Sequence, residues 1–299
     1  KSLVLGNQFN HCPSLNHSQI SSFQIPNMML SGNSSFISSP FSLAFSPPKR
    51  IPCLQSSFSF KPYSRSGRSP PSKTAVRMSS SQTLVEHVVL FKVKENTDPS
   101  KVNAMVTELN SLVSIDEVLH LAAGPVFRNQ FSSLNYTHAL HSRYKTKEDL
   151  EAYAANPSHV GVVNESVLPI IEDAMAVDWI ADGGYEDDLV APPPGSAVRL
   201  SFLKLKESLG DKEKSEILGV IKGLRRDFPE IKQITCGENF SPARAKGYSL
   251  ASFAVFPGMS EMDAVDAKEE LVNSQKEKIK EYLESMFVVD YVIPAPASL

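Results

Sequence analysis

The residue types best suited to chemistry in this sequence are a tyrosine and a histidine six positions apart, Tyr153 and His159. They lie on the two sides of the Asn156-Pro157 pair, where a helix should end because proline lacks a backbone N–H. An imidazole can take a proton from a carbon beside a carbonyl group, and a phenol can hydrogen-bond the enolate oxygen that forms. A helix break can hold two such side chains over one pocket. It can also be a simple junction between helices, and both interpretations stay open.

Helices are expected on both sides of this break. Thr146 followed by Asp149 is a capping pattern that starts a short helix ending at Asn156-Pro157. Ser158 can cap the next helix. That helix presents an apolar face made of Val160, Val163 and Val167.

Strand patterns surround these helices. Four β-rich runs predict strands at residues 85–93, 117–123, 136–144 and 174–180. An amphipathic helix follows the Asp98-Pro99 start signal between the first two runs. Side chains alternate along a strand, so the first run has two faces. One face holds His87, Val89, Phe91 and Val93, and the other holds Val88, Leu90 and Lys92.

The same plan returns at an offset of about 112 residues, which indicates a tandem repeat. Tyr136 aligns with Tyr248, and Val177-Asp178-Trp179 aligns with Val289-Asp290-Tyr291. Each copy reads strand, helix, strand, strand, helix, strand, which is the ferredoxin-like order. We therefore predict an α+β fold of two tandem ferredoxin-like units whose antiparallel four-stranded sheets pair into an α/β barrel.

The second copy lacks the candidate chemistry. At the repeat offset, His87, Tyr153 and His159 are replaced by Arg199, Val265 and Leu271. The stretch 260–284 contains no proline, so its two short helices are expected to merge without a break. A ligand pocket is therefore expected in the first half, although drift in a purely structural protein would leave the same asymmetry.

Composition divides the chain into five segments. They are a leader (1–84), a first domain (85–181), a Pro-rich linker (182–195), a second domain (196–294) and a short tail (295–299). The first 85 residues contain 22 Ser, eight Lys or Arg and no acidic residue, so the leader is expected to be disordered and transit-peptide-like. The terminal Ala297-Ser298-Leu299 is a loose variant of a peroxisomal address. Chloroplast, peroxisome or both are the expected destinations.

Charge and hydropathy argue against two classes of partner. Beyond the leader, 22 basic residues stand against 33 acidic ones, a net charge of −11. An acidic body without a basic stripe does not suit nucleic acid. No run reaches the roughly 18 apolar residues that a membrane-spanning helix needs. Cys236 is the single cysteine outside the leader, so no intrachain disulfide framework is expected.

Five motifs resemble a known family. They are His87-Val-Val-Leu-Phe-Lys, Tyr136-Thr-His138, Tyr153, Pro157-Ser-His159-Val160 and Val177-Asp-Trp179. Together they resemble the stress-responsive A/B barrel family, also called Dabb or dimeric α-β barrel, across residues 86–294 as two tandem units. The run 237–247 makes the likeness narrower, to the two-domain plant members, which are peroxisome-associated stress-response proteins.

This resemblance also implies roles for residues. In a polyketide cyclase of the family, the histidine of the Pro-x-His motif is the general base and the tyrosine six residues earlier assists. The likeness therefore assigns catalytic roles to His159 and Tyr153. His87 and His138 are similar to positions that line the cavity of that enzyme, and Tyr136 completes the candidate ligand-binding set.

No cofactor and no side-chain metal site are expected. His138 and His141 are three apart on a predicted strand, so they should point to opposite faces and cannot easily chelate one ion. Some family members hold a magnesium-like ion on backbone carbonyls after the first helix, here about residues 113–116. Related α+β barrels bind haem through a histidine, which gives one more alternative.

Two function classes follow. The favoured one is a stress-response barrel protein without catalysis that binds a small apolar or phenolic ligand in a first-half pocket. The alternative is a cyclase or lyase with His159 as base and Tyr153 as helper. Because one chain carries both units, a monomeric pseudo-dimer is expected, with a homodimer as the alternative.

Overall fold

The computed structural model describes residues 83–131, 133–182 and 186–295. The chain divides into two compact units, Lys1–Ser72 and Lys73–Leu299, and the described residues all belong to the second. The predicted leader, apart from Thr83 and Leu84, lies outside the described residues, as does the terminal Ala297-Ser298-Leu299.

Among the described residues, the first half has four strands and three α-helices. The strands are β1 (Thr83–Val93), β2 (His120–Gln130), β3 (His138–Tyr144) and β4 (Ile171–Asp182). The helices are α1 (Pro99–Ser111), α2 (Lys147–Ala155) and α3 (Pro157–Val162). The capping box at the start of α2 is confirmed, with Thr146 and Asp149 each accepting a backbone N–H of the other residue.

The cap predicted for α3 was wrong by two residues. Asn156, not Ser158, caps this helix, because its side chain accepts the backbone N–H of Ser158 at 2.9 Å. Pro157 then occupies the first helical position. A backbone N–H at this position has no partner within the helix, so proline breaks no hydrogen bond there. The Asn156-Pro157 pair therefore ends one helix and begins the next without a gap.

The second half repeats the order. Its strands are β5 (Ala197–Leu205), β6 (Gln233–Glu238), β7 (Leu250–Phe256) and β8 (Leu283–Val292). Its helices are α4 (Asp211–Asp227), α5 (Met259–Asp266) and α6 (Glu269–Lys280).

The expected merger of the last two helices was wrong. The chain leaves helical geometry at Lys268, between α5 and α6. Ion pairs hold both sides of this break, because Asp266 binds Arg199 at 2.6 Å and Lys268 binds Glu230 at 2.5 Å. A helix break at this position is therefore common to both halves, and it does not by itself mark the first half.

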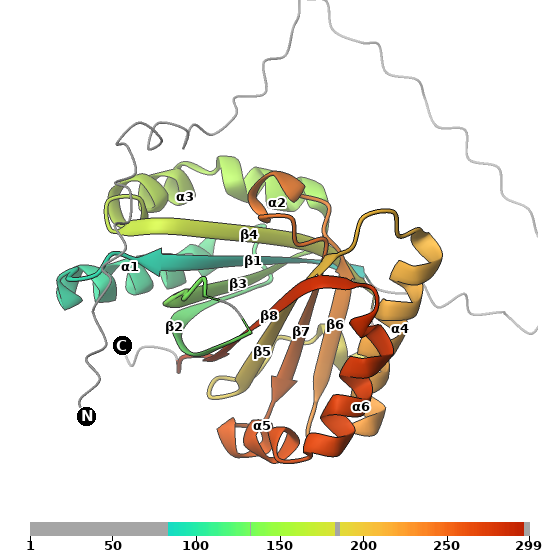
Figure 1. Ribbon diagram of the computed structural model, residues 1–299. Helices are drawn as coiled ribbons and strands as arrows, with labels where there is room; N and C mark the ends of the chain where they lie inside the picture. The colour runs from blue at the N-terminus through green and yellow to red at the C-terminus, as the bar shows by residue number, and fades with distance from the viewer. Residues whose placement is uncertain (1–82, 132, 183–185, 296–299) are drawn as a thin grey trace, which may run out of the picture. The chain divides into compact units, whose positions relative to one another are not determined.

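The eight strands form one sheet in the order β4-β1-β3-β2-β8-β5-β7-β6, with antiparallel pairing. β2 pairs with β8 and joins the halves, with Val126 opposite Tyr291. Trp179 of β4 forms a bridge with Asn239, the residue directly after β6, so the two ends of the sheet close on each other. Figure 1 shows α1–α3 beside the first four strands and α4–α6 beside the last four. The predicted α+β tandem ferredoxin-like fold with paired sheets is confirmed.

In the described part of the chain, buried apolar side chains form three cores. The barrel interior is filled from both halves, by residues such as Val88, Trp179, Phe202 and Phe287. The two outer cores lie between each half of the sheet and its own helices. Alternation along β1 is confirmed, since Val88 and Leu90 face the interior while Val85 and Phe91 face the helices.

The closing contact between β4 and β6 requires a glycine. A Cβ atom at Gly237 would lie 2.8 Å from the carbonyl oxygen of Ile180 and 2.8 Å from Cδ1 of Trp179. Neither atom can move easily, because one is backbone and the other belongs to a fully buried ring. Gly124, which aligns with Gly237 after a one-residue insertion, is less confined, since its nearest contact would be the carbonyl oxygen of Val292 at 3.4 Å.

A group of buried polar side chains lies inside the barrel, and we call Glu86, His141, Arg143 and Thr235 the interior network. Glu86 accepts hydrogen bonds from Arg143 at 3.0 Å and from Thr235 at 2.9 Å. His141 Nε2 lies 2.6 Å from the same carboxylate. Burial raises the pKa of Glu86, but Arg143 and His141 outweigh it and hold that pKa well below its usual range.

The segment between the halves is more than a spacer. Asp188 lies in its described part and is buried, and its carboxylate accepts the backbone N–H of Ile234 at 3.1 Å and binds Arg225 at 2.6 Å. Arg143 donates to the backbone carbonyls of Asp188 and Val190. This segment therefore ties the interior network to the second half.

Candidate functional site

The first component of the site is a histidine–aspartate pair on neighbouring strands. The β1–β4 register places His87 opposite Asp178, and both side chains are buried on the helix-facing side of the sheet. Nδ1 of His87 lies 2.5 Å from the Asp178 carboxylate. Since a carboxylate accepts hydrogen bonds, Nδ1 carries the proton in this contact. Burial raises the pKa of Asp178, but His87 outweighs it, with help from Ser241 and Arg244, and the pKa is lowered.

Two tyrosines lie beside this pair. Tyr144 ends β3 and Tyr153 lies in α2, and their ring centroids are 5.2 Å apart. The Tyr144 hydroxyl is also 3.0 Å from that of Ser142. Both rings meet His87 edge-on, at 6.3 and 6.5 Å. Burial raises the pKa of Tyr153 to about 12, so its phenol stays protonated near neutral pH.

His159 completes the group from α3. Its ring lies 4.5 Å from that of Tyr153, and its Nδ1 lies 3.1 Å from the carbonyl oxygen of Ala154. The carbonyl can only accept, so Nδ1 carries the proton. Burial lowers the pKa of His159, with smaller contributions from His87 and Arg244. The neutral imidazole therefore keeps its free electron pair on Nε2. We call His87, Asp178, Tyr144, Tyr153 and His159 the His–Tyr cluster.

A segment from the second half covers this cluster. The backbone N–H of Phe240 donates to the Asp178 carbonyl at 2.9 Å, and the side-chain oxygen of Asn239 accepts the Asp178 backbone N–H at 3.1 Å. Lys147 of α2 lies over the Phe240 ring at 4.0 Å. Lys246 binds Asp173 at 2.8 Å. The first-half site is therefore completed by residues 239–247 of the second half.

Two predicted ligand residues lie elsewhere. His138 lies on the helix-facing side of the sheet, but it pairs with Phe91 in the strand register. It is four positions along β3 from Ser142, the residue that lies opposite His87. Its Nδ1 lies 2.9 Å from the Thr137 hydroxyl. Tyr136 packs in the barrel interior against Phe287, on the other side of the sheet. The structure thus brings together His87, Tyr153 and His159 but not Tyr136 or His138.

Three members of the site had no role in the sequence prediction: Asp178, Tyr144 and Ser142. One signal was available for Asp178, since the repeat retains an aspartate at Asp290. In the second half Arg199 replaces His87 and binds Asp290 at 2.9 Å, so the cross-strand pair persists with arginine in place of histidine. Tyr144 and Ser142 become visible only once the β1–β3 register sets Ser142 opposite His87.

The described ranges contain neither a cluster of metal-binding side chains nor a membrane-spanning helix. His138 and His141 point to opposite faces as predicted, since His141 belongs to the interior network. Over residues 83–131, 133–182 and 186–295, no group of three His, Cys, Asp or Glu side chains is placed to hold a metal ion. No helix in those ranges is long and apolar enough to span a membrane.

Comparison with known proteins finds two repeats of one domain. The stress responsive A/B barrel domain matches residues 85–181 and 197–293. A stress-response A/B barrel domain-containing protein of Arabidopsis thaliana is 57% identical over 212 residues, which cover 71% of this chain and 80% of that protein. A second Arabidopsis protein of the same description is 46% identical over 215 residues, which cover 71% of this chain and 98% of that protein.

Solved structures show the same fold at low identity. An anthrone oxidase-like protein is 11% identical with a TM-score of 0.52, covering 74% of this chain and 98% of its own. Identity at this level supports the architecture alone.

Proposed function

The chain belongs to the stress-responsive A/B barrel family, and we propose that it acts there as a binding protein for a small phenolic ligand at the first-half His–Tyr cluster. One observation carries this proposal. His159 presents an unprotonated Nε2 beside the protonated phenol of Tyr153, within one group of aromatic rings. A phenolic hydroxyl can donate to that nitrogen and accept from that hydroxyl, while its ring packs on the two side chains.

The cluster is closely packed, so a ligand needs a way in. Tyr153 is 2% exposed, whereas His159 is only partly buried and lies at the rim. His159 is held by its bond to Ala154 and its contact with Tyr153. Entry therefore requires the imidazole to turn outward, or residues 239–247 to lift from Asp178.

A cyclase or lyase is the second candidate, and the same geometry favours it. The free Nε2 of His159 can take a proton next to a carbonyl, and the Tyr153 hydroxyl can hydrogen-bond the enolate oxygen. Asp178 holds the His87 ring in place beside them. A suitable substrate is a linear chain with two carbonyl groups separated by one carbon, because its central protons are acidic.

His159→Phe is expected to weaken binding of resorcinol, the simplest dihydroxy phenol, by about three- to tenfold, because it removes one hydrogen bond and keeps the aromatic contact. Calorimetric titration of the full chain measures this. Because burial lowers the pKa of His159 from 6.5, affinity should persist as pH falls below 6.5 and decline only once the imidazole protonates.

His138→Phe is the matched control, since this histidine shares the sheet face but lies outside the cluster. Equal affinities for the two variants would exclude the site. Turnover of a 1,3-dicarbonyl probe that disappears in His159→Phe would favour the enzyme, and binding without turnover would favour the binding protein.

A further inference from the structure

The second half contains a cavity of about 150 Å³ between its sheet and the helices α4 and α6. We propose that this cavity is a separate binding site for a small neutral molecule with one ring, or a short apolar chain, and one hydroxyl group. It lies in the other half of the molecule from the His–Tyr cluster and does not depend on it.

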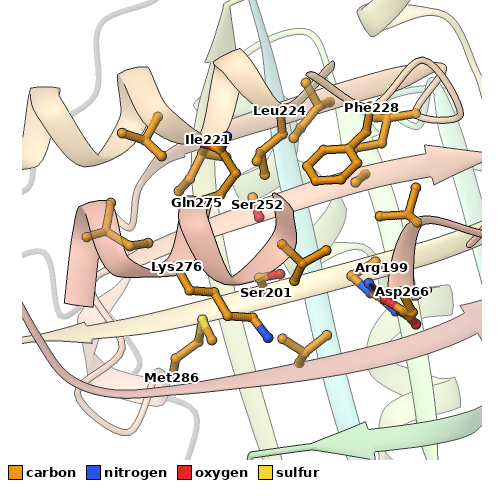
Figure 2. A pocket seen from close by; sticks show the side chains of 18 of the residues that line it. Arg199, Ser201, Ile221, Leu224, Phe228, Ser252, Asp266, Gln275, Lys276 and Met286 are labelled. Carbon is orange, nitrogen blue, oxygen red and sulfur yellow. Dashed lines mark hydrogen bonds and ion pairs between the residues drawn. The ribbon is translucent and has the colours of Figure 1, made fainter. Parts of the chain in front are cut away.

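Volume limits the ligand. Apolar cavities of about 150 Å³ in other proteins stay dry and bind benzene, so a single ring fits here. The walls are largely aliphatic and aromatic, with Ile221 and Leu224 from α4, Phe228 just after it, and Met286 from β8. Figure 2 shows these side chains around the serines at the sheet side.

Two serine hydroxyls give the cavity a polar spot. Ser201 of β5 and Ser252 of β7 lie opposite each other in the strand register and both line the cavity. Ser252 is 6% exposed, and within the described part of the chain neither hydroxyl has a hydrogen-bond partner. Both residues line the cavity, and a ligand hydroxyl would supply a hydrogen-bond partner that the described protein groups do not.

The repeat shows that these serines are not required by the fold. The aligned residues of the first half are Val89 and Leu140, which pack in the corresponding outer core. A sheet-to-helix core of this kind is therefore stable with apolar residues at both positions. The second half has polar groups where the first half has none, and an open volume beside them.

The cationic side chains at the edge of the cavity already have contacts within the protein. Arg199 donates to Asp266 at 2.6 and 2.8 Å and to Asp290 at 2.9 and 3.0 Å. Lys276 lies over the ring of Phe131 at 4.7 Å. Because the guanidinium is already bound to two carboxylates, a charged ligand group would gain little there. The class of ligand is therefore neutral.

The test uses toluene and benzyl alcohol, titrated separately into the full chain and followed by calorimetry and by the Met286 methyl NMR signal. Both are expected to bind and to shift that signal, with benzyl alcohol the tighter. Ser252→Ala should weaken benzyl alcohol about three- to tenfold and leave toluene unchanged, since only the hydroxyl is lost.

Ser252→Leu introduces the first-half residue and fills the cavity, so it should abolish binding of both. Ser201→Val, judged folded by near-ultraviolet circular dichroism, serves the same purpose if the leucine variant does not fold. His159→Phe should change neither affinity. The proposal is overturned if the wild type binds neither probe, if the filled variants bind as the wild type does, or if His159→Phe abolishes binding.

Discussion

Glu86→Ala is expected to lower the free energy of unfolding by about 3–5 kcal/mol, the range for breaking a buried ion pair on one side. The side chain is fully buried, and it accepts from Arg143 and Thr235 inside the barrel. Its removal leaves the Arg143 guanidinium, itself 1% exposed, without its carboxylate. Denaturant unfolding near neutral pH measures the loss.

Glu172→Ala is the control, because the Lys92–Glu172 pair lies at the surface, with side chains 35% and 43% exposed, and should contribute little. The pH dependence follows from the direction of the shift. The folded pKa of Glu86 lies below 4.5, so its stabilisation is complete above that pH and is lost as pH falls through the folded pKa. Glu86→Gln should remove this acid-dependent component. If Glu86→Ala lowered the free energy of unfolding by less than about 1 kcal/mol, the interior network would not stabilise the fold as proposed.

Gly237→Ala is expected to destabilise the protein by about 1–3 kcal/mol, as overpacking of a tight contact does. The added methyl would lie 2.8 Å from the Ile180 carbonyl oxygen and from Trp179. To make room, β6 must move away from β4 and weaken the closure of the barrel. Trp179 is the only tryptophan, so its fluorescence reports both the unfolding transition and any change at this seam.

The control for this prediction is Gly219→Ala, in the middle of α4. A Cβ atom there meets nothing within 4 Å, and alanine favours helix, so a gain of roughly 0.5–1 kcal/mol is expected. If both alanine variants were equally stable, the close approach at Gly237 would not be a constraint on the closed barrel.

The fold could be predicted because the patterns that indicate its strands and helices are local in the sequence and occur in both repeats. Alternation along residues 85–93 identified the two faces of β1, and the repeat implied a partner for each half. The predictions were wrong where tertiary contacts, and not the local sequence, determine where a helix ends. The break between α5 and α6 is held by ion pairs to distant residues, Asp266 with Arg199 and Lys268 with Glu230, which no local pattern shows.

The site was predictable in part for the same reason. Tyr153 and His159 are neighbours along the chain, so their proximity follows from two adjoining helices. Tyr136 and His138 were both placed on the predicted strand 136–144, but β3 begins at His138, and Tyr136 lies before it. The regular alternation of the strand therefore does not extend to Tyr136, which packs in the barrel interior. Asp178 joins His87 through strand register, which the sequence does not specify.

The central claim is that His159 presents a free Nε2 to a ligand beside Tyr153. A long-range ¹⁵N–¹H spectrum of the histidine imidazoles tests it most directly, with the His159 signals identified by their loss in His159→Phe. Near neutral pH the account predicts protonated Nδ1 and unprotonated Nε2 for His159, and a shift of that Nε2 signal on addition of resorcinol. A protonated Nε2, or resorcinol that shifts other histidines but leaves His159 unchanged, would contradict it.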